Sequence, residues 1–496
     1  MPAPRSLVLA LDVGTSSARA GFYDRRGRLL PSTECATPYV PAWTEDGGAT
    51  LAPGALLAAL AAAVDGALHA ADRLPGRPQP AAVGISTFWH SLMGVDGKGR
   101  AVTPVFLWAD TRAGAVVPQL KRRLGAGYHQ RTGAPVHSTF WPAKLVWLRR
   151  TQPRSFARVA RWMSFAEYLF LRWCGAPRCS VSMASATGLW NYRQCGWDQP
   201  ALRAIGLSAS RLTVVDDAPA PGLAGSWRRR WAPLADIPWF PAWGDGACAN
   251  AGSGAVRAGK IAVTIGTSSA LRAVVPAPRR LRLSPGLWRY ALDARRHLVG
   301  GALSEGGNLF QWLRRELSWP PSASDAGLER RIAHRPPDGH GLTVLPYFAG
   351  ERSPGWSQGR RATIAGLTLA TTPVDLLQAG LEAVALRLAT TYQDLQQVLK
   401  QGGGRRPEIL AGGAALRHSS LWSQMLANAI GAPVRRLRVA ETSARGAALM
   451  AWERLGTSPL DRAPVPRERL FRPRPAAVVA LRAARHRQDR LRGLMS

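Results

Sequence analysis

Two stretches of the chain share one pattern of apolar runs and small polar residues. In residues 7–23, an apolar run of strand length leads to the turn Gly14-Thr15-Ser16-Ser17, and a second apolar run follows it. Residues 260–275 repeat this order around Gly266-Thr267-Ser268-Ser269. Apolar runs of this length separated by turn residues predict β-hairpins. The repetition predicts two domains built on the same plan, each of which contributes one polar hairpin tip to a shared cleft.

Longer apolar patterns predict the helices of both domains. Residues 51–73 combine a helical composition with Pro53 near the start, where proline is tolerated. Residues 174–245 are rich in Pro, Trp and Gly, and we expect irregular excursions built around a site there. The other helices are expected at 113–124, 142–150, 165–173, 305–318, 374–400, 419–430 and 440–456, and further short strands at 81–86, 104–108 and 408–410.

The length of the chain indicates more than one domain. At 496 residues it exceeds what one ordinary hydrophobic core holds. We predict an N-terminal domain at 1–253 and a C-terminal domain at 254–462, the second closed by the helix at 440–456. The Arg-rich tail, 463–496, is predicted to be a solvated helix with a disordered approach, outside the site.

Three features of the sequence bear on where the protein is found. No stretch reaches about 18 uninterrupted apolar residues, so no membrane span is expected. Asp12 interrupts the first apolar run, which therefore lacks the form of a signal peptide. The five cysteines form no metal-type or redox spacing, as suits a reducing cytosol. We therefore predict a cytoplasmic protein without a membrane partner.

The formal net charge of +34 invites comparison with nucleic-acid-binding proteins. The excess is almost all Arg, it is spread along the chain, and no zinc-finger or RNP-type motif accompanies it. Positive charge alone supports non-specific polyanion binding and says nothing about fold. We therefore expect no specific nucleic-acid partner, and a positive surface that helps attract negatively charged small molecules.

The first hairpin tip carries groups that suit phosphate oxygens. It offers backbone N–H groups, hydroxyls and the cation Arg19. Asp12, at the end of the first strand, is a candidate for Mg²⁺, held through water because Mg²⁺ keeps most of its hydration shell. The alternatives are an ordinary hairpin with polar turn residues, and a strand-end Asp bonded to the turn amides. The second tip at 266–269 favours the phosphate interpretation.

Several segments, in order along the chain, resemble the FGGY carbohydrate kinase family, whose members share a two-domain actin-like or ribonuclease-H-like architecture. LDVGTSSAR and IGTSSAL resemble its two phosphate elements, and residues 410–434 resemble its adenosine element. Residues 142–150 and 363–382 resemble the two family signatures, the second of which departs at Gly380, where a residue with a side chain is usual. The resemblance covers about residues 7–455 and implies an α/β fold with two domains flanking a catalytic cleft.

The resemblance implies a role for each motif. Asp245 would accept the proton of the attacking sugar hydroxyl, although an Asp at this place also fits a helix N-cap. A glycine lets a backbone N–H approach an oxygen closely, which suits phosphate and adenosine contacts. The implied phosphate-binding residues are Thr15, Ser16, Ser17, Arg19, Gly266, Thr267 and Ser268, and the implied adenosine-binding residues are Gly412, Gly413 and Ala414, which otherwise form a tight strand-to-helix turn.

Within the family, the sugar-contacting segments are most similar to those of gluconokinases. The implied sugar-binding residues are His90, Trp108, Asp110 and Arg112. A Trp ring covers a sugar face, and Asp and Arg bond hydroxyls. Arg112 or His90 also suits the carboxylate of an aldonic acid, which a neutral ketose lacks. Ordinary packing is the alternative for His90 and Trp108.

Three charged residues near these segments are given structural roles. Lys144 matches a Lys of the first signature, and a structural ion pair is expected for it. Glu351 and Arg352, in the loop 345–355, are expected to shape the cleft rather than act on substrate.

The expected function is ATP-dependent phosphorylation of D-gluconate to 6-phospho-D-gluconate, with Mg²⁺, in a cleft that closes by hinge motion. Pentulose kinases such as xylulokinase share the same skeleton and are the nearest alternative. A non-catalytic sugar sensor of this fold and a polyanion-binding protein are alternatives of other classes, and retention of Asp12 and Asp245 argues against the sensor. A homodimer is compatible with the sequence.

Overall fold

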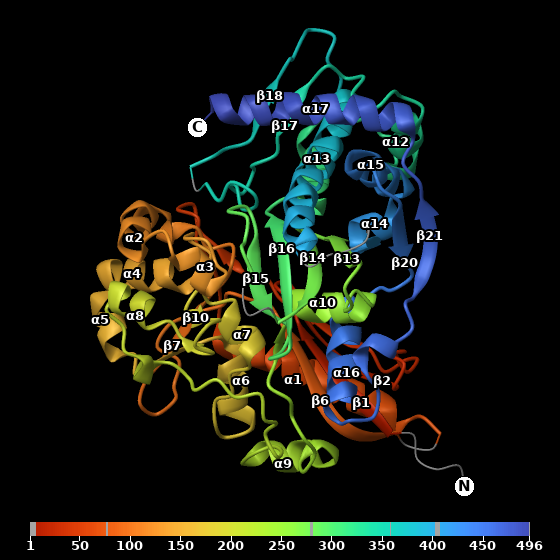
Figure 1. The fold of residues 1–496 in the computed structure, drawn as a ribbon. Coiled ribbons are helices and arrows are strands. Elements are labelled where there is room, and N and C mark those ends of the chain that lie inside the picture. Colours follow the sequence, from red (N-terminus) through yellow and green to blue (C-terminus); the bar gives the residue numbers. More distant parts are fainter. Residues whose placement is uncertain (1–5, 76–77, 278–280, 358, 402–406, 496) are drawn as a thin grey trace.

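The computed structural model describes residues 6–75, 78–277, 281–357, 359–401 and 407–495. They form two halves, each centred on a β-sheet and covered by helices, and the C-terminal half lies above the N-terminal half in Figure 1. A group of short helices from residues 112–205 extends to one side of the N-terminal half (Figure 1).

Two sheets organise the chain. The first consists of β1 (Ser6–Val13), β2 (Ser17–Tyr23), β3 (Cys35–Pro38), β6 (Gln79–Thr87) and β12 (Trp243–Gly244). The second consists of β13 (Lys260–Ile265), β14 (Ser269–Pro276), β15 (Trp288–Ala291), β16 (Arg296–Leu303), β19 (Glu408–Gly412), β20 (Val434–Leu437) and β21 (Arg467–Phe471).

The two sheets share one strand order. The first runs β3-β2-β1-β6-β12, and the second contains the matching succession β16-β14-β13-β19-β20, with β15 and β21 added at its edges. In both, the hairpin strands and the strand beyond the hairpin pair antiparallel. The two strands on the other side pair parallel. The prediction of two domains on one plan is therefore visible in the strand order itself.

Both predicted hairpins form. Val13 pairs with Ala18 at the end of the first, and Ile265 pairs with Ser269 at the end of the second. The residues 7–13 are buried throughout, because helices and strands cover both faces of the sheet at this strand. The two polar tips, 14–16 and 266–268, are the places where the paired strands stop.

Capping residues define the start of two predicted helices. Ser164 and Glu167 form a capping box at α6 (Phe165–Trp173), and Thr372 and Asp375 form one at α13 (Pro373–Lys400). The other longer helices are α1 (Pro53–Asp72), α2 (Val117–Leu124), α4 (Trp141–Thr151), α10 (Asp245–Ser253), α11 (Gly307–Glu316), α12 (Asp325–Ala333), α15 (Ser420–Ile430), α16 (Thr442–Arg454) and α17 (Pro475–Leu494). Apart from α10 and α12, these lie close to the predicted helical stretches.

Shorter elements fill the connections. The stretch 174–245, expected to be irregular, holds only elements of two to seven residues before Asp245. The short helices are α3 (Tyr128–Thr132), α5 (Pro153–Arg158), α7 (Val181–Ser185), α8 (Gln199–Ile205), α9 (Ser226–Arg230) and α14 (Ala414–His418). The short strands are β4 (Ala42–Trp43), β5 (Ala49–Leu51), β7 (Met93–Val95), β8 (Val105–Phe106), β9 (Arg161–Met163), β10 (Trp190–Asn191), β11 (Gly196–Trp197), β17 (Thr343–Leu345) and β18 (Thr363–Ala365).

The helices α10 and α16 cross in close contact between the two halves. A Cβ atom on Gly446 would lie 1.8 Å from the carbonyl oxygen of Cys248, and one on Gly252 would lie 1.8 Å from that of Thr442. Glycine at both positions therefore lets the two backbones touch. The buried Arg445 donates to the carbonyls of Gly27, Gly252 and Pro464, which joins the turn after β2, α10 and the segment before β21.

The packing of α16 differs from its predicted place as the closing helix of the C-terminal domain. Ala444, Ala447 and Leu449 are part of the same hydrophobic core as the strands β1 and β6. The chain therefore returns to the first half after β20 and crosses back to form β21. The domain limits 1–253 and 254–462 stay a prediction.

The tail 463–496 also differs from its prediction. Its approach is not disordered, because β21 pairs antiparallel with β20 as the edge strand of the second sheet. The helix α17 buries Leu481 and Ala484 against Leu386 of α13 and Ala429 of α15. Within the described residues, ion pairs hold it between Asp489 and Arg387 (2.7 Å), Arg487 and Asp338 (2.5 Å), and Arg492 and Glu351 (3.3 Å).

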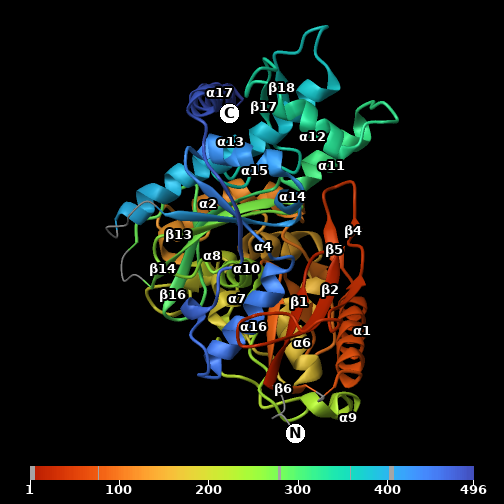
Figure 2. The ribbon, with the colours of Figure 1, turned by 90° about the vertical axis from the view of Figure 1, so that its right-hand side faces the viewer.

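Among the described residues, α1 is the one helix whose length and composition would suit a membrane span. It instead lies alongside the first sheet, as Figure 2 shows. Leu56, Leu60, Val64 and Ala67 are buried in the core that it shares with β1 and β2. These contacts are those of a core helix in a folded domain.

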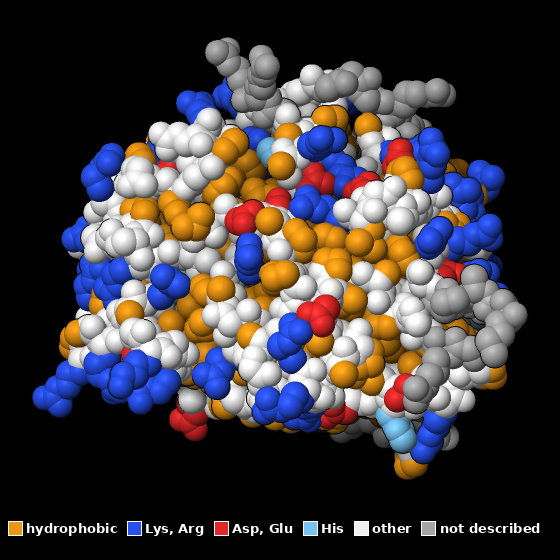
Figure 3. Space-filling view, turned by 90° about the horizontal axis from the view of Figure 1, so that it is seen from below, with side chains coloured by type: hydrophobic (Ala, Val, Ile, Leu, Met, Phe, Trp, Pro, Cys, Tyr) orange, Lys and Arg blue, Asp and Glu red, His pale blue; other side chains and the backbone are white. Residues whose placement is uncertain are grey.

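The positive charge is distributed in the structure as it is in the sequence. Figure 3 shows Lys and Arg side chains scattered over the face seen from below, with neutral and apolar side chains between them. Many of the described Arg side chains are paired with carboxylates, such as Arg178 with Asp216 and Arg435 with Glu408.

Candidate active site

A cavity of about 330 Å³ lies between the two halves, and both hairpin tips open into it. A larger cavity of about 870 Å³ adjoins it and shares Thr15, Ser16, Thr267, Trp108 and Arg352 as lining residues. We call the first the inner cavity and the second the outer cavity. The predicted site residues that line the inner cavity are Asp12, Thr15, Ser16, Ser17, Arg19, His90, Trp108, Asp245, Gly266, Thr267 and Ser268.

The first tip places one carboxylate and one cation at the cavity. Asp12 is 5% exposed, and Arg19 lies 3.8 Å from its carboxylate and 3.6 Å from that of Glu441. Burial raises the pKa of Asp12 to about 7, with Arg19 opposing the rise and Glu441 and Asp245 adding to it. Acidic groups thus gather around Asp12 with little positive charge to balance them.

The second tip and the predicted adenosine turn lie on the C-terminal half. Gly412 pairs with Thr264, so Gly413 and Ala414 follow β19 at the same sheet edge as Gly266 follows β13. Gly413 has φ +100° and passes close to the Ile265 carbonyl, where a Cβ would lie 2.4 Å away. These three residues line neither cavity among the residues described, and their adenosine role stays a prediction.

Asp245 stands at the start of α10, with Gly244 as the N-cap residue. Its carboxylate accepts a hydrogen bond from the Gly246 backbone N–H at 2.7 Å. Burial raises the pKa of Asp245, while the nearby Arg272 and Arg352 lower it. The N-cap residue is therefore Gly244 and not Asp245, and the Asp245 carboxylate lines the cavity.

The glycines beside Asp245 make room for an indole ring. A Cβ on Gly244 would lie 1.8 Å from the Trp89 indole, and one on Gly246 would lie 2.3 Å from it. The indole therefore packs directly on the backbone around Asp245, and its Nε1 donates to the carbonyl of Ser182. The glycines admit Trp89, and through it they hold Asp245, rather than opening space for substrate.

The side of the inner cavity around His90 is aromatic. His90 has φ +67°, is buried, and its Nδ1 lies 2.7 Å from the Ala186 carbonyl oxygen. Its pKa lies well below the usual range because of burial. Trp89, Trp288 and Tyr290 pack beside it, with Trp288 and Tyr290 stacked at 4.1 Å. The buried Tyr290 hydroxyl has no hydrogen-bond partner in the described part of the chain and lines the cavity, as a contact for a polar ligand would.

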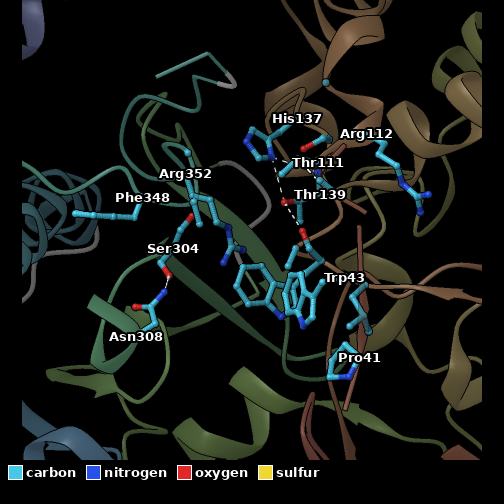
Figure 4. Close-up of a pocket in the computed structure, with 18 of the residues that line it drawn as sticks. Pro41, Trp43, Thr111, Arg112, His137, Thr139, Ser304, Asn308, Phe348 and Arg352 are labelled. Atoms are coloured by element: carbon cyan, nitrogen blue, oxygen red, sulfur yellow. Dashed lines mark hydrogen bonds between the residues drawn. The ribbon is translucent and has the colours of Figure 1, made fainter. Parts of the chain in front are cut away.

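Asp110 and Arg112 are paired with each other. Asp110 is buried, and its carboxylate accepts a hydrogen bond from the Ala49 backbone N–H. The Arg112 guanidinium donates to the same carboxylate, with 2.6 Å between nitrogen and oxygen. The Arg112 guanidinium also lies over Trp147 at 4.8 Å and points away from Arg352 in Figure 4. Neither residue lines the inner cavity, and Arg112 lines only the outer one. The sugar-binding role of Asp110 and Arg112 stays a prediction. Their contacts with each other, with Ala49 and with Trp147 hold the local structure in place.

From the sequence, Arg352 was expected only to shape the cleft. The structure places its guanidinium inside the cleft. It lines both cavities, and its guanidinium lies 5.1 Å from the Trp108 ring centroid. In Figure 4 it reaches from the C-terminal half toward the middle of the pocket. Whether the Arg352 guanidinium has a carboxylate partner depends on residues far away in the sequence. The residues next to Arg352 therefore do not predict its place in the cleft.

Comparison with known proteins accounts for this arrangement. The family model described as "FGGY family of carbohydrate kinases, N-terminal domain" matches residues 7–250, and the corresponding C-terminal model matches residues 261–452. The chain belongs to the FGGY family of carbohydrate kinases. The fold is accordingly α/β with two actin-like, ribonuclease-H-like domains, as predicted.

Individual relatives of this FGGY kinase carry different names. It is 27% identical to a gluconokinase of Bacillus subtilis (strain 168) over 464 residues, which covers 90% of this chain and 87% of the relative. It is 31% identical to a glycerol kinase of Aromatoleum aromaticum over 472 residues, covering 90% and 89%. Solved structures of a gluconate kinase and a xylulose kinase, both from Lactobacillus acidophilus, each superpose with a TM-score of 0.88 at 23% identity, covering 99% of this chain and 98% of theirs.

A magnesium ion fits the inner cavity of this FGGY kinase. Asp12 is a buried carboxylate whose pKa is raised, and the acids Glu441 and Asp245 add to that effect. A divalent cation would relieve this excess of negative charge, and carboxylate oxygen is the ligand type that Mg²⁺ prefers. Asp12 is therefore the residue that would hold the ion, together with phosphate oxygens and water.

Lys144, the signature lysine, bonds to carbonyls rather than to a carboxylate. It is 1% exposed, and its Nζ donates to the carbonyls of His90 (3.2 Å), Leu107 (2.7 Å) and Thr139 (3.0 Å). The expected ion pair is therefore not seen among the described residues. Lys144 ties together the segments that carry His90 and Trp108, and so positions the aromatic side of the cavity.

Replacing Lys144 with methionine should disturb the sugar side without touching ATP binding. Three buried carbonyls would lose their donor, at about 1–3 kcal/mol for each polar group left unpaired. We expect a clear drop in thermal midpoint and a several-fold rise in KM for the sugar, with KM for ATP within twofold. The exposed Lys121→Met is the control. An unchanged sugar KM in Lys144→Met would contradict the positioning role.

Proposed function

We propose that this FGGY kinase transfers the γ-phosphoryl group of ATP to D-gluconate, giving 6-phospho-D-gluconate and ADP. The observation that carries the proposal is one cavity that holds Asp245, Asp12 and both hydroxyl-lined tips, at 14–17 and 266–268. Phosphoryl transfer needs a positioned acceptor, a base for its proton and neutralised phosphate charge, and this cavity offers a group for each.

In the proposed reaction, Asp245 takes the proton of the acceptor hydroxyl as that oxygen attacks the γ-phosphorus. The bond between the γ-phosphorus and its bridging oxygen breaks, and ADP leaves. Thr15, Ser17 and Thr267 would donate to phosphate oxygens from the two sides of the cleft. Mg²⁺, when bound near Asp12, would neutralise charge on the phosphate oxygens. The turn at 412–414 would hold adenosine, and His90 and Trp108 the sugar.

D-gluconate is favoured over other acceptors by two relatives and by charge. The curated relative from Bacillus subtilis and one matched structure are named gluconokinase and gluconate kinase. The cation Arg352 lies in the cleft beside Trp108, where an acidic substrate would benefit from it. Relatives named glycerol kinase and xylulose kinase are similarly distant, so polyols and pentuloses are the competing substrates.

A coupled assay of ADP release over D-gluconate, D-xylulose and glycerol tests the proposal on the purified enzyme. We expect kcat/KM for D-gluconate to exceed that for the two neutral substrates by at least about tenfold, the discrimination that one charged contact of about 1.4 kcal/mol provides. A mass increase of one phosphate on the product confirms transfer. Higher kcat/KM on D-xylulose or glycerol would replace gluconate with that acceptor, and ADP release without any phosphorylated product would contradict kinase activity.

A further inference from the structure

Arg352 is presented to the substrate by a loop that is held from behind. The loop joins β17 to β18 in the C-terminal half. Its neighbour Glu351 is 1% exposed, accepts from the Tyr347 hydroxyl at 3.0 Å, and pairs with Arg360 at 3.4 Å and with Arg492 of α17 at 3.3 Å. These contacts fix the backbone at Arg352, so the guanidinium is pre-organised at the cleft.

The guanidinium of Arg352 lacks the partners that other buried arginines of this chain have. The residue is 9% exposed, and among the described residues its guanidinium forms no hydrogen bond and no ion pair with a carboxylate within 4 Å. Its contacts are aromatic: the rings of Trp108 at 5.1 Å and Trp356 at 5.9 Å. By contrast, Arg272 donates to Asn250 and Thr264, and Arg112 pairs with Asp110.

A buried guanidinium without a carboxylate partner is stabilised when it binds an anion. Removing a charge from water is costly unless an opposite charge or hydrogen-bond acceptors replace the water. Asp245 and Glu305 act on Arg352 from a distance, and neither bonds to it. His90 and His137 beside it stay neutral, because burial and the charge of Arg352 lower the pKa of each. These two imidazoles therefore add no positive charge beside the Arg352 guanidinium.

The position of Arg352 points to the acceptor substrate rather than to the nucleotide. Its guanidinium lies against the Trp108 ring, whereas Arg19 at the first tip pairs with the carboxylates of Asp12 and Glu441. His90 and His137, the side chains whose pKa it influences, belong to the N-terminal half that forms the sugar side.

We propose that Arg352 binds the carboxylate of the aldonate substrate and is the residue that selects an acidic acceptor over a neutral one. The proposal rests on the proposed function. A carboxylate accepts two parallel hydrogen bonds from a guanidinium, a geometry that a hydroxyl or a keto group does not match. Because Arg352 belongs to the C-terminal half and His90 and Trp108 to the N-terminal half, the acidic substrate would bridge the two halves and favour the closed cleft.

The test compares Arg352→Gln and Arg352→Lys with the wild-type enzyme on D-gluconate and on D-glucitol, the neutral polyol of the same chain length. Arg73→Gln, on the exposed end of α1, is the matched control. Steady-state constants for each acceptor and for ATP come from coupled ADP release, and thermal midpoints check folding. We expect Arg352→Gln to lower kcat/KM for D-gluconate about 10- to 100-fold, the loss typical of a charged hydrogen-bonded contact.

In the same variant, kcat/KM for D-glucitol should not fall, KM for ATP should stay within twofold, and Arg352→Lys should recover part of the D-gluconate activity. Equal losses on both acceptors, or a rise in KM for ATP, would assign Arg352 to the transferring phosphate and overturn the inference while leaving the kinase function intact. A wild-type enzyme that phosphorylates neutral acceptors and not D-gluconate would instead overturn the proposed function, and the carboxylate role with it.

Discussion

Asp245→Asn should lower kcat about 10²- to 10⁴-fold, the contribution typical of a general base. Asparagine keeps the shape of the side chain and can still accept the Gly246 N–H bond of 2.7 Å, so the start of α10 should be preserved. It cannot take a proton from the acceptor hydroxyl. KM for D-gluconate and for ATP should change little, because the loss concerns the transition state rather than ground-state binding.

The measurement is coupled ADP release at saturating substrate, with ATP binding followed by calorimetry. Asp236→Asn is the control, because Asp236 forms a surface ion pair with Arg228 and its side chain is 77% exposed. If Asp245→Asn kept kcat within tenfold of the wild type, another group would have to be the base, and the inner cavity would lose its central assignment.

Gly446→Ala should destabilise the fold strongly and lower activity with it. The added Cβ would lie 1.8 Å from the Cys248 carbonyl oxygen, a backbone atom that cannot turn aside as a side chain can. We expect a loss of about 3 kcal/mol in the free energy of unfolding, at the upper end for overpacking, against which the better helix propensity of alanine returns at most about 1 kcal/mol. Because α10 carries Asp245, forcing α10 and α16 apart also moves the base.

Urea unfolding gives the stability change, and kcat under native conditions gives the displacement of Asp245. Gly54→Ala is the matched control, because this helical glycine at the start of α1 has open space where the methyl group would go. It should leave stability equal or slightly higher. A Gly446→Ala protein as stable as the wild type would show that the two helices separate at little cost.

Much of the site followed from local sequence because hairpin tips are local structures. The turns 14–16 and 266–268 form where the apolar runs stop, and the order of strands around them repeats as the two GTSS segments suggested. Asp12 was a candidate as an acid at the end of a strand, and Asp245 was implied by the family resemblance; both line the inner cavity, and their roles stay predictions.

What could not be predicted depends on contacts between distant residues. Asp110 pairs with Arg112, while the Arg352 guanidinium, more than 200 positions away, has no carboxylate partner within the part of the chain that the structure describes. The glycines at 244 and 246 are explained by Trp89, and the carbonyl contacts of Lys144 come from three separate segments. The strand Arg467–Phe471 carries mostly charged residues, which are exposed at the sheet edge. Its sequence therefore lacks the alternation of apolar and polar residues that predicts a strand.

The ion pair between Arg492 and Glu351 has a consequence for synthesis of the chain. Arg492, which steadies the loop between β17 and β18, is synthesised only after all the strands of both sheets. Until α17 is complete, Leu386 and Ala429 also remain open to water. A product of premature termination before residue 475 should therefore be a target for proteases and for aggregation rather than a less selective enzyme.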